Sequence, residues 1–375
     1  MMKAFQIVPA IAEYEKFADF ARGAGLGSND LILTNEYIYR PVISELGLGC
    51  ETIFQEKFGV GEPTDEMVDA ILNELREKEY GRIIAVGGGT VIDIAKVLAV
   101  AAPGDKVDDL YDRMAEGLVK IHPLLIVPTT CGTGSEVTNI SIINKVSKGV
   151  KQGIVSSAMF ADEAALIPEM LMSLPYGVFA TSSIDAMVHA VESYLSPNAC
   201  ALSELFSVEA IHFILKGWKR ALEKGGTETW KESALEFLRA SNYAGIAFGY
   251  AGCAAVHAMA YPLGSVHHIP HGQANQLMFA EVMKKYVQKQ PKGKLENLEA
   301  VLGEELGVAA KAGLDRLYRL MDDVLKCTPL REHGIKEEEL PVFAKNVVET
   351  QQRLLNNNYV ALTEGEILEI YRGAF

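Results

Sequence analysis

The feature that most constrains the fold is a change of periodicity near residue 177. Before it, short apolar runs alternate with amphipathic segments that have helical spacing. The apolar runs predict buried strands at 30–34, 51–54, 82–86 and 123–127. The amphipathic segments predict helices between them, at 64–77 and 91–101. Strands that alternate with helices form parallel sheets, so we expect an α/β domain over residues 1–176.

The second part of the chain, residues 177–375, has a different character. Its long segments are rich in Ala, Leu and Glu and follow a helical period, and no strand pattern is convincing there. Helices are predicted at 203–222, 228–247, 270–287, 308–325 and 337–355. We therefore expect an all-α domain to follow the α/β domain.

Charge and composition exclude several classes of function. The net charge of −14 without clustered Lys or Arg argues against nucleic-acid and anionic-membrane partners. No apolar run reaches the roughly 18 residues that span a bilayer, and charged side chains interrupt the first twenty residues, so we expect a cytoplasmic protein. Five cysteines without short spacing argue against a disulfide framework or a cysteine zinc site.

Two polar loops follow consecutive predicted strands. Gly87, Gly88, Gly89 and Thr90 link a buried strand to a helix, where glycines admit a close ligand and free helical N–H groups favour a pyrophosphate. The second loop offers four hydroxyls, on Thr129, Thr130, Thr133 and Ser135. Either loop alone is also compatible with an ordinary turn. Together, at the carboxyl ends of neighbouring parallel strands, they indicate a nucleotide site.

A metal site is indicated in the second part of the chain. Asp185 and His189 are four residues apart and share one face of a predicted helix. His257 and His271 are fourteen apart and are separated by Pro262, Gly264 and Pro270. This spacing predicts a helix, a proline-broken turn and a second helix that starts near His271, and the turn could return both imidazoles to one point. One carboxylate and three imidazoles suit Fe(II) or Zn(II). Spacing alone leaves each histidine equally compatible with a hydrogen-bonded core residue.

Four long motifs resemble the signatures of the iron-containing (group III) alcohol dehydrogenase family. They are GGGTVIDIAK (87–96), PTTCGTGSEVTN (128–139), SSIDAMVHAVE (182–192) and VHAMAYPLG with IPHGQAN (256–275), in the family's order and over nearly the whole chain. The resemblance implies a Rossmann-like dinucleotide-binding domain and a helical metal-binding domain, an architecture shared with dehydroquinate synthase. It also implies an enzyme that uses NAD and Fe(II), or Zn(II), and that forms a homodimer.

Residue roles are carried over from the family by position. The resemblance implies that the metal ligands are Asp185, His189, His257 and His271. It implies that the cofactor contacts include Asn35, the glycine loop with Thr90 and Asp93, the four hydroxyls of the second loop, and Lys151 at the ribose.

This chain departs from the family pattern at two positions. At the end of the first predicted strand the family usually has an aspartate that accepts hydrogen bonds from ribose hydroxyls, and this chain has Asn35. A neutral amide repels a 2′-phosphate less than a carboxylate does, so the sequence favours NAD over NADP only weakly. Four residues after His257 the family usually has a proton-relay histidine, and this chain has Tyr261. A phenol with an ordinary pKa near 10 suits a relay poorly, so His267 or His268 could take that role.

Within the family, further segments are similar to the members that interconvert 4-hydroxybutyrate and succinate semialdehyde: NEYIYRP (35–41), FQEKFGVGEPTDEM (54–67), SNYAGIAFG (241–249) and PLREHGIKEEE (329–339). A hydroxy acid needs an anchor for its carboxylate, and Arg353 with Asn358 is our hypothesis. Arg331 is the other candidate, and a surface arginine is equally compatible with either position. The alternative functions are a dehydrogenase of an uncharged alcohol (butanol, lactaldehyde or glycerol type) and, with sparser support, a dehydroquinate synthase-like lyase.

Overall fold

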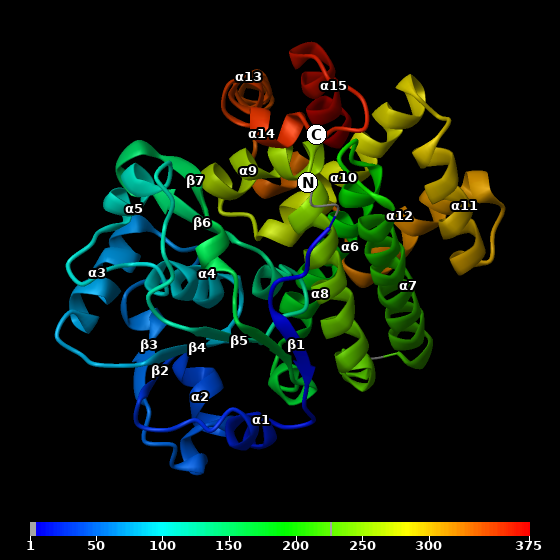
Figure 1. Cartoon of the computed structure of the whole chain (residues 1–375). Helices are drawn as coiled ribbons and strands as arrows, with labels where there is room; N and C mark the ends of the chain where they lie inside the picture. The colour runs from blue at the N-terminus through cyan, green and yellow to red at the C-terminus, as the bar shows by residue number, and fades with distance from the viewer. Residues whose placement is uncertain (1–4, 226) are drawn as a thin grey trace. The chain divides into compact units, whose positions relative to one another are not determined.

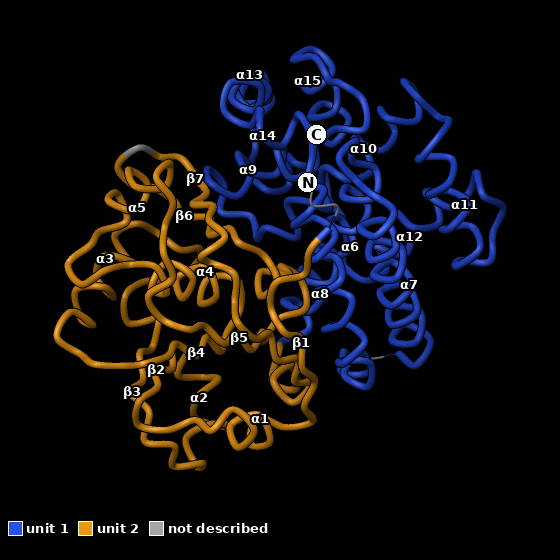
Figure 2. The backbone as a smooth tube through the Cα atoms, in the orientation of Figure 1, with its two compact units in different colours: residues 1–5, 175–375 blue, residues 6–174 orange. Residues whose placement is uncertain are grey.

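The computed structural model describes residues 5–225 and 227–375. The chain forms two compact units, one of Gln6–Leu174 and a larger one that contains Pro175–Phe375 (Figure 2). Each unit has its own set of elements and its own buried side chains.

The first unit is built on a parallel sheet, which confirms the predicted α/β architecture. Its six strands lie in the order β1-β8-β5-β4-β2-β3, and β6 and β7 form a separate antiparallel pair. The strands are β1 (Ala10–Glu13), β2 (Asp30–Thr34), β3 (Glu51–Phe54), β4 (Arg82–Gly87), β5 (Leu124–Pro128), β6 (Ile140–Lys145), β7 (Val150–Val155) and β8 (Glu163–Leu166).

Helices cover both faces of this sheet, because its central strands are apolar on both sides. On β2, Leu31 and Leu33 belong to one buried cluster, whereas Ile32 belongs to the cluster on the opposite face. Figure 1 shows the two helical layers, which contain α3 (Asp65–Leu75), α4 (Gly89–Leu98) and α5 (Val107–Arg113) on one face and α1 (Phe17–Gly23) and α2 (Glu36–Val42) on the other.

The strand order reverses between β2 and β4. From β2 the chain moves outward to β3 and then returns to β4 on the other side of β2. Ligands of open α/β sheets bind at such a switch point, outside the carboxyl ends of the strands. Asn35 follows β2 at this edge, and the glycine loop follows β4.

The second unit is all-helical in its described residues, which confirms the other half of the predicted fold class. Its helices are α6 (Tyr176–Leu195), α7 (Ala201–Lys224), α8 (Ala234–Ala251), α9 (Ala255–His267), α10 (His271–Lys289), α11 (Lys294–Leu306), α12 (Gly313–Val324), α13 (Leu340–Thr350), α14 (Gln352–Leu355) and α15 (Glu364–Ala374).

α6 is the central helix of this unit and packs against α7, α8 and α10. It is apolar on nearly every side and buried from Phe179 onward except at two positions, as expected of a helix with neighbours all round. Aromatic side chains fill the contacts: Phe179 stacks on Trp230 with ring centroids 4.1 Å apart, and Nε1 of Trp218 donates to Oγ of Ser183 at 2.9 Å.

Two helices joined by a turn carry His257 and His271, and the second begins at His271, as predicted. The turn is shorter than expected, because Pro262 lies inside the first helix and does not break it. α9 runs through Pro262 to His267 and ends at His268, whose φ of 55° is left-handed. The buried position of Pro262 shows that packing outweighs the one backbone hydrogen bond that proline removes. The turn between the two histidine-bearing helices is therefore confined to residues 268–270.

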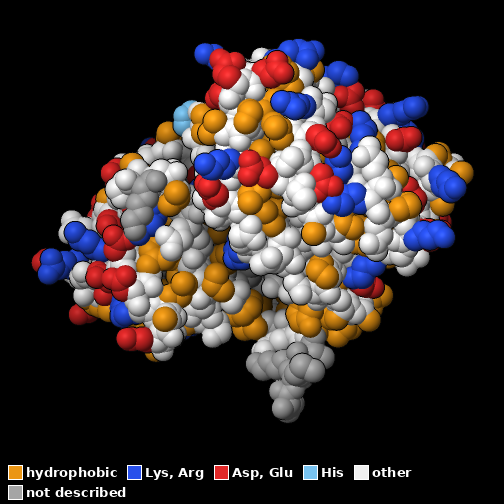
Figure 3. Space-filling model, turned by 90° about the horizontal axis from the view of Figure 1, so that it is seen from above, with side chains coloured by type: hydrophobic (Ala, Val, Ile, Leu, Met, Phe, Trp, Pro, Cys, Tyr) orange, Lys and Arg blue, Asp and Glu red, His pale blue; other side chains and the backbone are white. Residues whose placement is uncertain are grey.

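Two further predicted helices differ in their limits. The segment predicted at 337–355 is divided into α13 and α14, and the one predicted at 308–325 becomes regular only at Gly313. On the face drawn in Figure 3, Lys and Arg side chains are interspersed with Asp and Glu side chains. Among the described residues no single helix has the length and hydropathy of a membrane span; one pair, bent by 107°, meets those criteria only when taken together.

Candidate functional site

Asp185 and His189 project from one face of α6, as their spacing of four residues predicts. Both side chains are buried, and Nδ1 of His189 lies 4.0 Å from Oδ2 of Asp185. Because α6 is surrounded by other helices, these two polar groups are held away from bulk water. A buried carboxylate requires a compensating partner, which a cation can provide.

His257 and His271 reach the same carboxylate from α9 and α10. Nε2 of each imidazole lies 3.6 Å from Oδ1 of Asp185, and one donor atom from each of the three residues lies within 4.8 Å of the other two. Ligand atoms bound at about 2.0–2.2 Å around a tetrahedral ion lie about 3.4 Å apart. The observed separations therefore fit a single divalent metal.

The close approach of α10 to α6 depends on Gly272. A Cβ at this position would lie 1.9 Å from the carbonyl oxygen of Thr181 and 3.3 Å from Cβ of Asp185. Glycine thus lets the first turn of α10, which carries His271, pack against the turn of α6 that carries the carboxylate. One turn further along α10, Asn275 donates from Nδ2 to Oδ1 of Asp185 at 2.7 Å.

Glu192 orients His257, a role that the sequence analysis missed. Its fully buried carboxylate accepts hydrogen bonds from Nδ1 of His257 at 2.6 Å and from the backbone N–H groups of Ala254 and Val256 at 2.9 and 2.6 Å. Nε2 of His257 is buried without a hydrogen-bond partner among the described residues. A proton fixed on Nδ1 leaves the Nε2 lone pair facing Asp185, which is the tautomer that metal binding requires.

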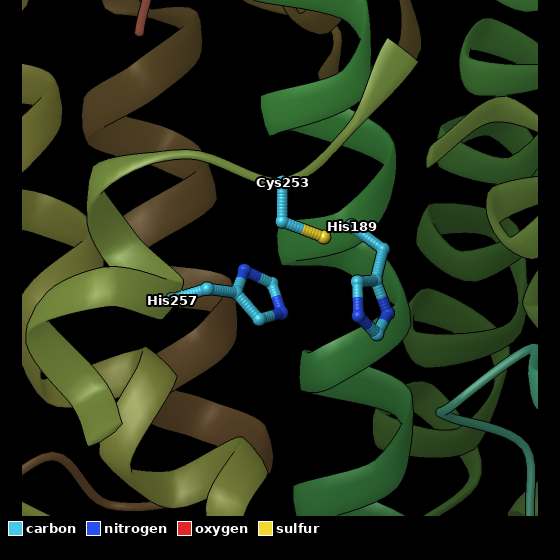
Figure 4. Close-up of side chains that lie close together, drawn as sticks. All are labelled: His189, Cys253 and His257. Atoms are coloured by element: carbon cyan, nitrogen blue, oxygen red, sulfur yellow. The ribbon is translucent and has the colours of Figure 1, made fainter. Parts of the chain in front are cut away.

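A second group of donors includes Cys253, which lies in the connection before α9. Its Sγ and one ring nitrogen each of His189 and His257 lie within 4.8 Å of one another, and all three side chains are buried. Figure 4 shows these side chains turned toward one another. The two imidazole rings are stacked, with centroids 4.5 Å apart. Cys253 stands four residues before His257, but it lies in the connection before α9 and not on that helix.

The carboxylate, the imidazoles and the thiol shift one another's pKa values. Burial would raise the pKa of Asp185, but the imidazoles of His189, His271 and His257 hold that pKa well below its usual range. Burial lowers the pKa of His189, but the nearby carboxylate of Asp185 raises it, and the net effect is a raised pKa. Burial would raise the pKa of the Cys253 thiol, yet His257 and His189 lower it to about 7. A divalent cation binding here would replace the imidazole protons.

In the first unit, the glycine loop joins β4 to α4, where the sequence predicts it. No side chain caps the first turn of α4. A Cβ on Gly88 would lie 3.2 Å from Cγ2 of Thr130, and one on Gly89 would lie 3.0 Å from Cγ2 of Thr133. The two loops therefore pack closely because the glycines have no side chains, and the backbone N–H groups of the uncapped first turn of α4 fit a pyrophosphate.

Asp93 and Ser135 link the two loops through a network centred on Lys96. Oγ of Ser135 donates to Oδ1 of Asp93 at 2.7 Å. Lys96, which the sequence analysis did not single out, is fully buried, and burial lowers its pKa to about 8. Its Nζ donates at 2.7 to 2.9 Å to Oγ of Ser135, Oγ1 of Thr138 and the carbonyl oxygen of Ile140. The network fixes the second loop against α4.

Three other residues assigned to the cofactor lie around the same loops. Thr129 is buried at the end of β5, and the hydroxyl of Thr90 donates to the carbonyl oxygen of Gly61 at 2.9 Å. Lys151, on β7, pairs with Glu62 at 2.5 Å between Nζ and Oε2. The segment that contains Gly61 and Glu62 is thus joined both to the glycine loop and to Lys151.

Asn35 lies at the carboxyl end of β2 within a polar cluster. Its Nδ2 donates to Oε1 of Gln55 at 3.1 Å and to Oε2 of Glu56 at 2.9 Å, and its Oδ1 accepts from the hydroxyl of Tyr37 at 3.3 Å. Oε1 of Glu56 accepts from the backbone N–H of Glu36 at 2.6 Å. A carboxylate therefore lies beside the neutral residue that replaces the family's aspartate.

Of the three residues considered for proton relay, the structure brings Tyr261 to the metal donors. Its ring centroid lies 6.1 Å from that of His271. Nε2 of His267 lies 3.0 Å from Oε1 of Glu339, and His268 is exposed where α9 ends. The latter two histidines are thus placed at the far end of the helix.

Three residues were considered for substrate binding, and of these Arg331 donates to the backbone oxygen of Phe375 at 2.6 Å. The other two differ in burial. Arg353 is exposed on α14, whereas Asn358 is buried, and neither side-chain atom of its amide has a hydrogen-bond partner among the described residues. The adjacent Asn357 donates from Nδ2 to the carbonyl oxygen of Cys253 at 2.9 Å. This segment therefore packs on the connection that carries the cysteine.

Comparison with known proteins agrees with this arrangement. Residues 12–168 match the family described as iron-containing alcohol dehydrogenase, and residues 179–375 match the Fe-containing alcohol dehydrogenase family, C-terminal. The chain is 44% identical over 371 residues to 4-hydroxybutyrate dehydrogenase of Clostridium kluyveri, an alignment that covers 99% of each chain.

Two solved structures have the same fold over the whole chain. The iron-containing alcohol dehydrogenase of Thermococcus thioreducens is 27% identical, with a TM-score of 0.84 and 99% of both chains covered. Sulfoacetaldehyde reductase of Bifidobacterium kashiwanohense, in complex with NAD+, is 23% identical, with a TM-score of 0.85 and 100% and 99% covered. On these matches, the chain belongs to the iron-containing alcohol dehydrogenase family of oxidoreductases.

Proposed function

We propose that this enzyme transfers a hydride between NAD(H) and 4-hydroxybutyrate or succinate semialdehyde, with Fe(II) as its metal. The observation that carries the proposal is the convergence of Asp185, His257 and His271, in which the buried Nε2 of His257 faces the carboxylate at 3.6 Å and has no hydrogen-bond partner among the described residues. The choice of substrate is supported by the similarity to the 4-hydroxybutyrate dehydrogenase of Clostridium kluyveri along the full chain.

The chain's own residues bind and orient the reactants. A bound divalent metal supplies Lewis acidity at the alcohol oxygen, and NAD supplies the hydride acceptor. Asp185, His189, His257 and His271 hold the metal, while Glu192 keeps His257 in the required tautomer. The glycine loop and the first turn of α4 hold the pyrophosphate, with Asn35, Thr90, Asp93, Lys151 and the hydroxyls of the second loop around the rest of the dinucleotide.

Oxidation of the alcohol removes a hydride from carbon and a proton from oxygen. The ring of Tyr261 lies beside that of His271, with centroids 6.1 Å apart, and we assign its hydroxyl the proton transfer in place of the family's histidine. Asn358 supplies a buried amide whose N–H groups can donate to the substrate carboxylate, and Arg353 on the same segment adds a positive charge.

The proposal is tested by following NADH formation from 4-hydroxybutyrate and from 1-butanol, each with Fe(II) or Zn(II). We expect turnover of the hydroxy acid, with Fe(II) giving the higher rate. Asn358→Ala should raise KM for 4-hydroxybutyrate about tenfold and leave KM for butanol unchanged, because only the acid needs the amide. Asn356→Ala, at an exposed position, is the matched control.

Turnover of butanol alone would show that the substrate is an uncharged alcohol, and failure to transfer hydride from any alcohol would refute the enzymatic proposal. We also propose a homodimer, which the family resemblance implies, and a cytoplasmic location, which the hydropathy of the sequence favours. Light scattering of the purified enzyme and fractionation of the source cells test these two points.

A further inference from the structure

Cys253 gives this enzyme a second set of metal donors next to the first. Its Sγ and the imidazoles of His189 and His257 lie within 4.8 Å of one another and are all buried (Figure 4). A Zn(II) ion bound at about 2.3 Å to sulfur and about 2.0 Å to nitrogen holds such atoms about 3.5 Å apart, so small side-chain rotations suffice to close the site.

The two donor sets exclude one another. Nδ1 of His257 is engaged by Glu192, so Nε2 is the atom that binds in either set. The Asp185 set supplies oxygen and nitrogen and suits Fe(II), whereas the Cys253 set supplies a thiolate, which favours softer ions such as Zn(II). We propose that Cys253, with His189 and His257, forms an alternative Zn(II) position that competes with the Fe(II) position and determines which metal the enzyme retains.

The test loads the full-length protein, freed of metal, with Co(II), Zn(II) or Fe(II) alone and compares it with Cys253→Ser. We expect a thiolate-to-cobalt charge-transfer band in the near ultraviolet for the unmodified protein and no such band for the variant. We expect Zn(II) affinity to fall about 10- to 100-fold in Cys253→Ser while Fe(II) affinity changes by less than about threefold.

Cys131→Ser, a buried cysteine of the other unit, controls for loss of a thiol, and Cys253→Ala with circular dichroism controls for folding. Absence of the band from the unmodified protein, or equal Zn(II) affinity in Cys253→Ser, would overturn the inference and leave the proposed function intact. Failure of all three ions to bind would overturn both, because the inference rests on the proposed metal centre.

A separate observation concerns the choice between NAD and NADP. Glu56 lies beside Asn35 at the carboxyl ends of neighbouring strands β3 and β2. Its two oxygens are held in place by Nδ2 of Asn35 and by the backbone N–H of Glu36. The carboxylate is half-buried and lies 2.9 Å from Nδ2 of Asn35, the residue that stands at the position of the family's aspartate.

We infer that Glu56 determines specificity for NAD, an inference that rests on the proposed dinucleotide site. Its charge repels a 2′-phosphate, and its oxygens can accept from the ribose hydroxyls as an aspartate would. The neutral Asn35 after β2 would by itself allow NADP as well as NAD to bind. The selectivity for NAD is therefore assigned to Glu56, which follows the neighbouring strand β3. Asn35 then acts by holding Glu56 in position.

The test measures Kd for NADH and NADPH by fluorescence titration. We expect the unmodified protein to prefer NADH and Glu56→Gln to reduce that preference about tenfold, which corresponds to about 1.4 kcal/mol. Adding Asn35→Asp to Glu56→Gln should restore the preference, because a carboxylate returns to the same place. Glu51→Gln, at the opposite end of β3 and paired with Lys78, is the matched control.

An unchanged Kd ratio in Glu56→Gln, or equal binding of NADH and NADPH to the unmodified protein, would overturn the assignment to Glu56 while leaving the proposed function standing. If the protein bound neither dinucleotide, both the assignment and the proposed function would be refuted.

Discussion

Glu192 is a buried carboxylate whose acceptor capacity is used by three donors, one of which is the metal-facing His257. A buried charge is costly unless it is hydrogen-bonded, and these three donors compensate the charge of Glu192. By fixing the proton on Nδ1, it sets the direction of the Nε2 lone pair. We regard Glu192 as a positioning residue for the metal centre.

Glu192→Gln should weaken metal affinity about 10- to 100-fold, as expected for loss of a partner that orients a ligand. The amide keeps the shape but presents N–H groups where Glu192 now accepts hydrogen bonds. Metal content after dialysis against graded chelator measures the effect, and circular dichroism checks the fold. Glu204→Gln, which alters a surface pair with Lys294, should leave metal content unchanged. Equal retention by both variants would contradict the positioning role.

At the residue scale, sequence patterns identify groups whose spacing follows a helix. Asp185 and His189 are found this way, and Glu192 could have been, because it lies seven residues after Asp185 on the same face of an otherwise apolar helix. Cys253 also stands four residues before His257, but its approach to His189 depends on the loop between α8 and α9, which the sequence pattern does not show. The pairing of Asn35 with Glu56 is likewise hidden, because register between β2 and β3 brings them together.

The contact between α10 and α6 is the structural element on which the metal centre most depends. Gly272→Ala should lower the unfolding free energy by about 1–3 kcal/mol, the usual cost of overpacking, because its Cβ would meet the carbonyl oxygen of Thr181 at 1.9 Å. It should also reduce metal affinity by displacing His271. Urea unfolding and metal titration measure the two effects.

Gly365→Ala in α15 is the control, since a Cβ there meets nothing within 4 Å. Alanine is the better helix former, so this change should be neutral or stabilising by up to about 1 kcal/mol. If Gly272→Ala were as stable as this control and bound metal normally, the close contact could not be a requirement of the centre.

The first turn of α15 makes a pH-dependent contribution to the free energy of unfolding. A hydrogen bond from Lys289 and the backbone N–H of Thr363 lower the pKa of Glu366 to about 2, below its usual 4.5. The stabilisation is therefore present above pH 4.5 and is lost as the pH falls from 4.5 toward 2. Glu366→Gln should cost about 0.5–1 kcal/mol at pH 7 and progressively less below pH 4.5.

Urea midpoints of the unmodified protein and of Glu366→Gln, at pH 7, 4 and 3, test this dependence. Glu369→Gln, which breaks only the pair with Lys285, is the matched control. A difference between Glu366→Gln and the unmodified protein that stayed constant from pH 7 to pH 3 would show that the carboxylate charge contributes nothing.

Elements with a strong hydrophobic pattern, either a continuous apolar run or a helical period, are predictable from the sequence, and elements without such a pattern are not. The sequence indicates β2 and β4 because their side chains are buried on both faces. It does not indicate β1, a four-residue edge strand that is mostly exposed, or β8, which contains two alanines and little β-branched character. α9 was predicted to break at Pro262 because the sequence does not show the surrounding helices that hold it together.

At the scale of the whole molecule, the proposed binding sites for the metal and for the dinucleotide lie in different units. All assigned metal donors lie in Pro175–Phe375, and all assigned dinucleotide contacts lie in Gln6–Leu174. A ligand that binds only the native state stabilises it by about 2.7 kcal/mol at 100 times its Kd. Each ligand should therefore protect its own unit most strongly.

Hydrogen exchange measured by mass spectrometry checks this division. Removal of metal with a chelator should accelerate exchange most in the segments of α6, α9 and α10 that carry the four proposed metal ligands, because the buried carboxylate of Asp185 would lose the cation that compensates it. Addition of NADH should slow exchange most at the β4–α4 junction and in the hydroxyl-rich loop after β5. Within each experiment the other unit serves as the internal reference. If chelation instead accelerated exchange chiefly in the glycine loop, or NADH protected only α10, the assignment of each ligand to its unit would be wrong.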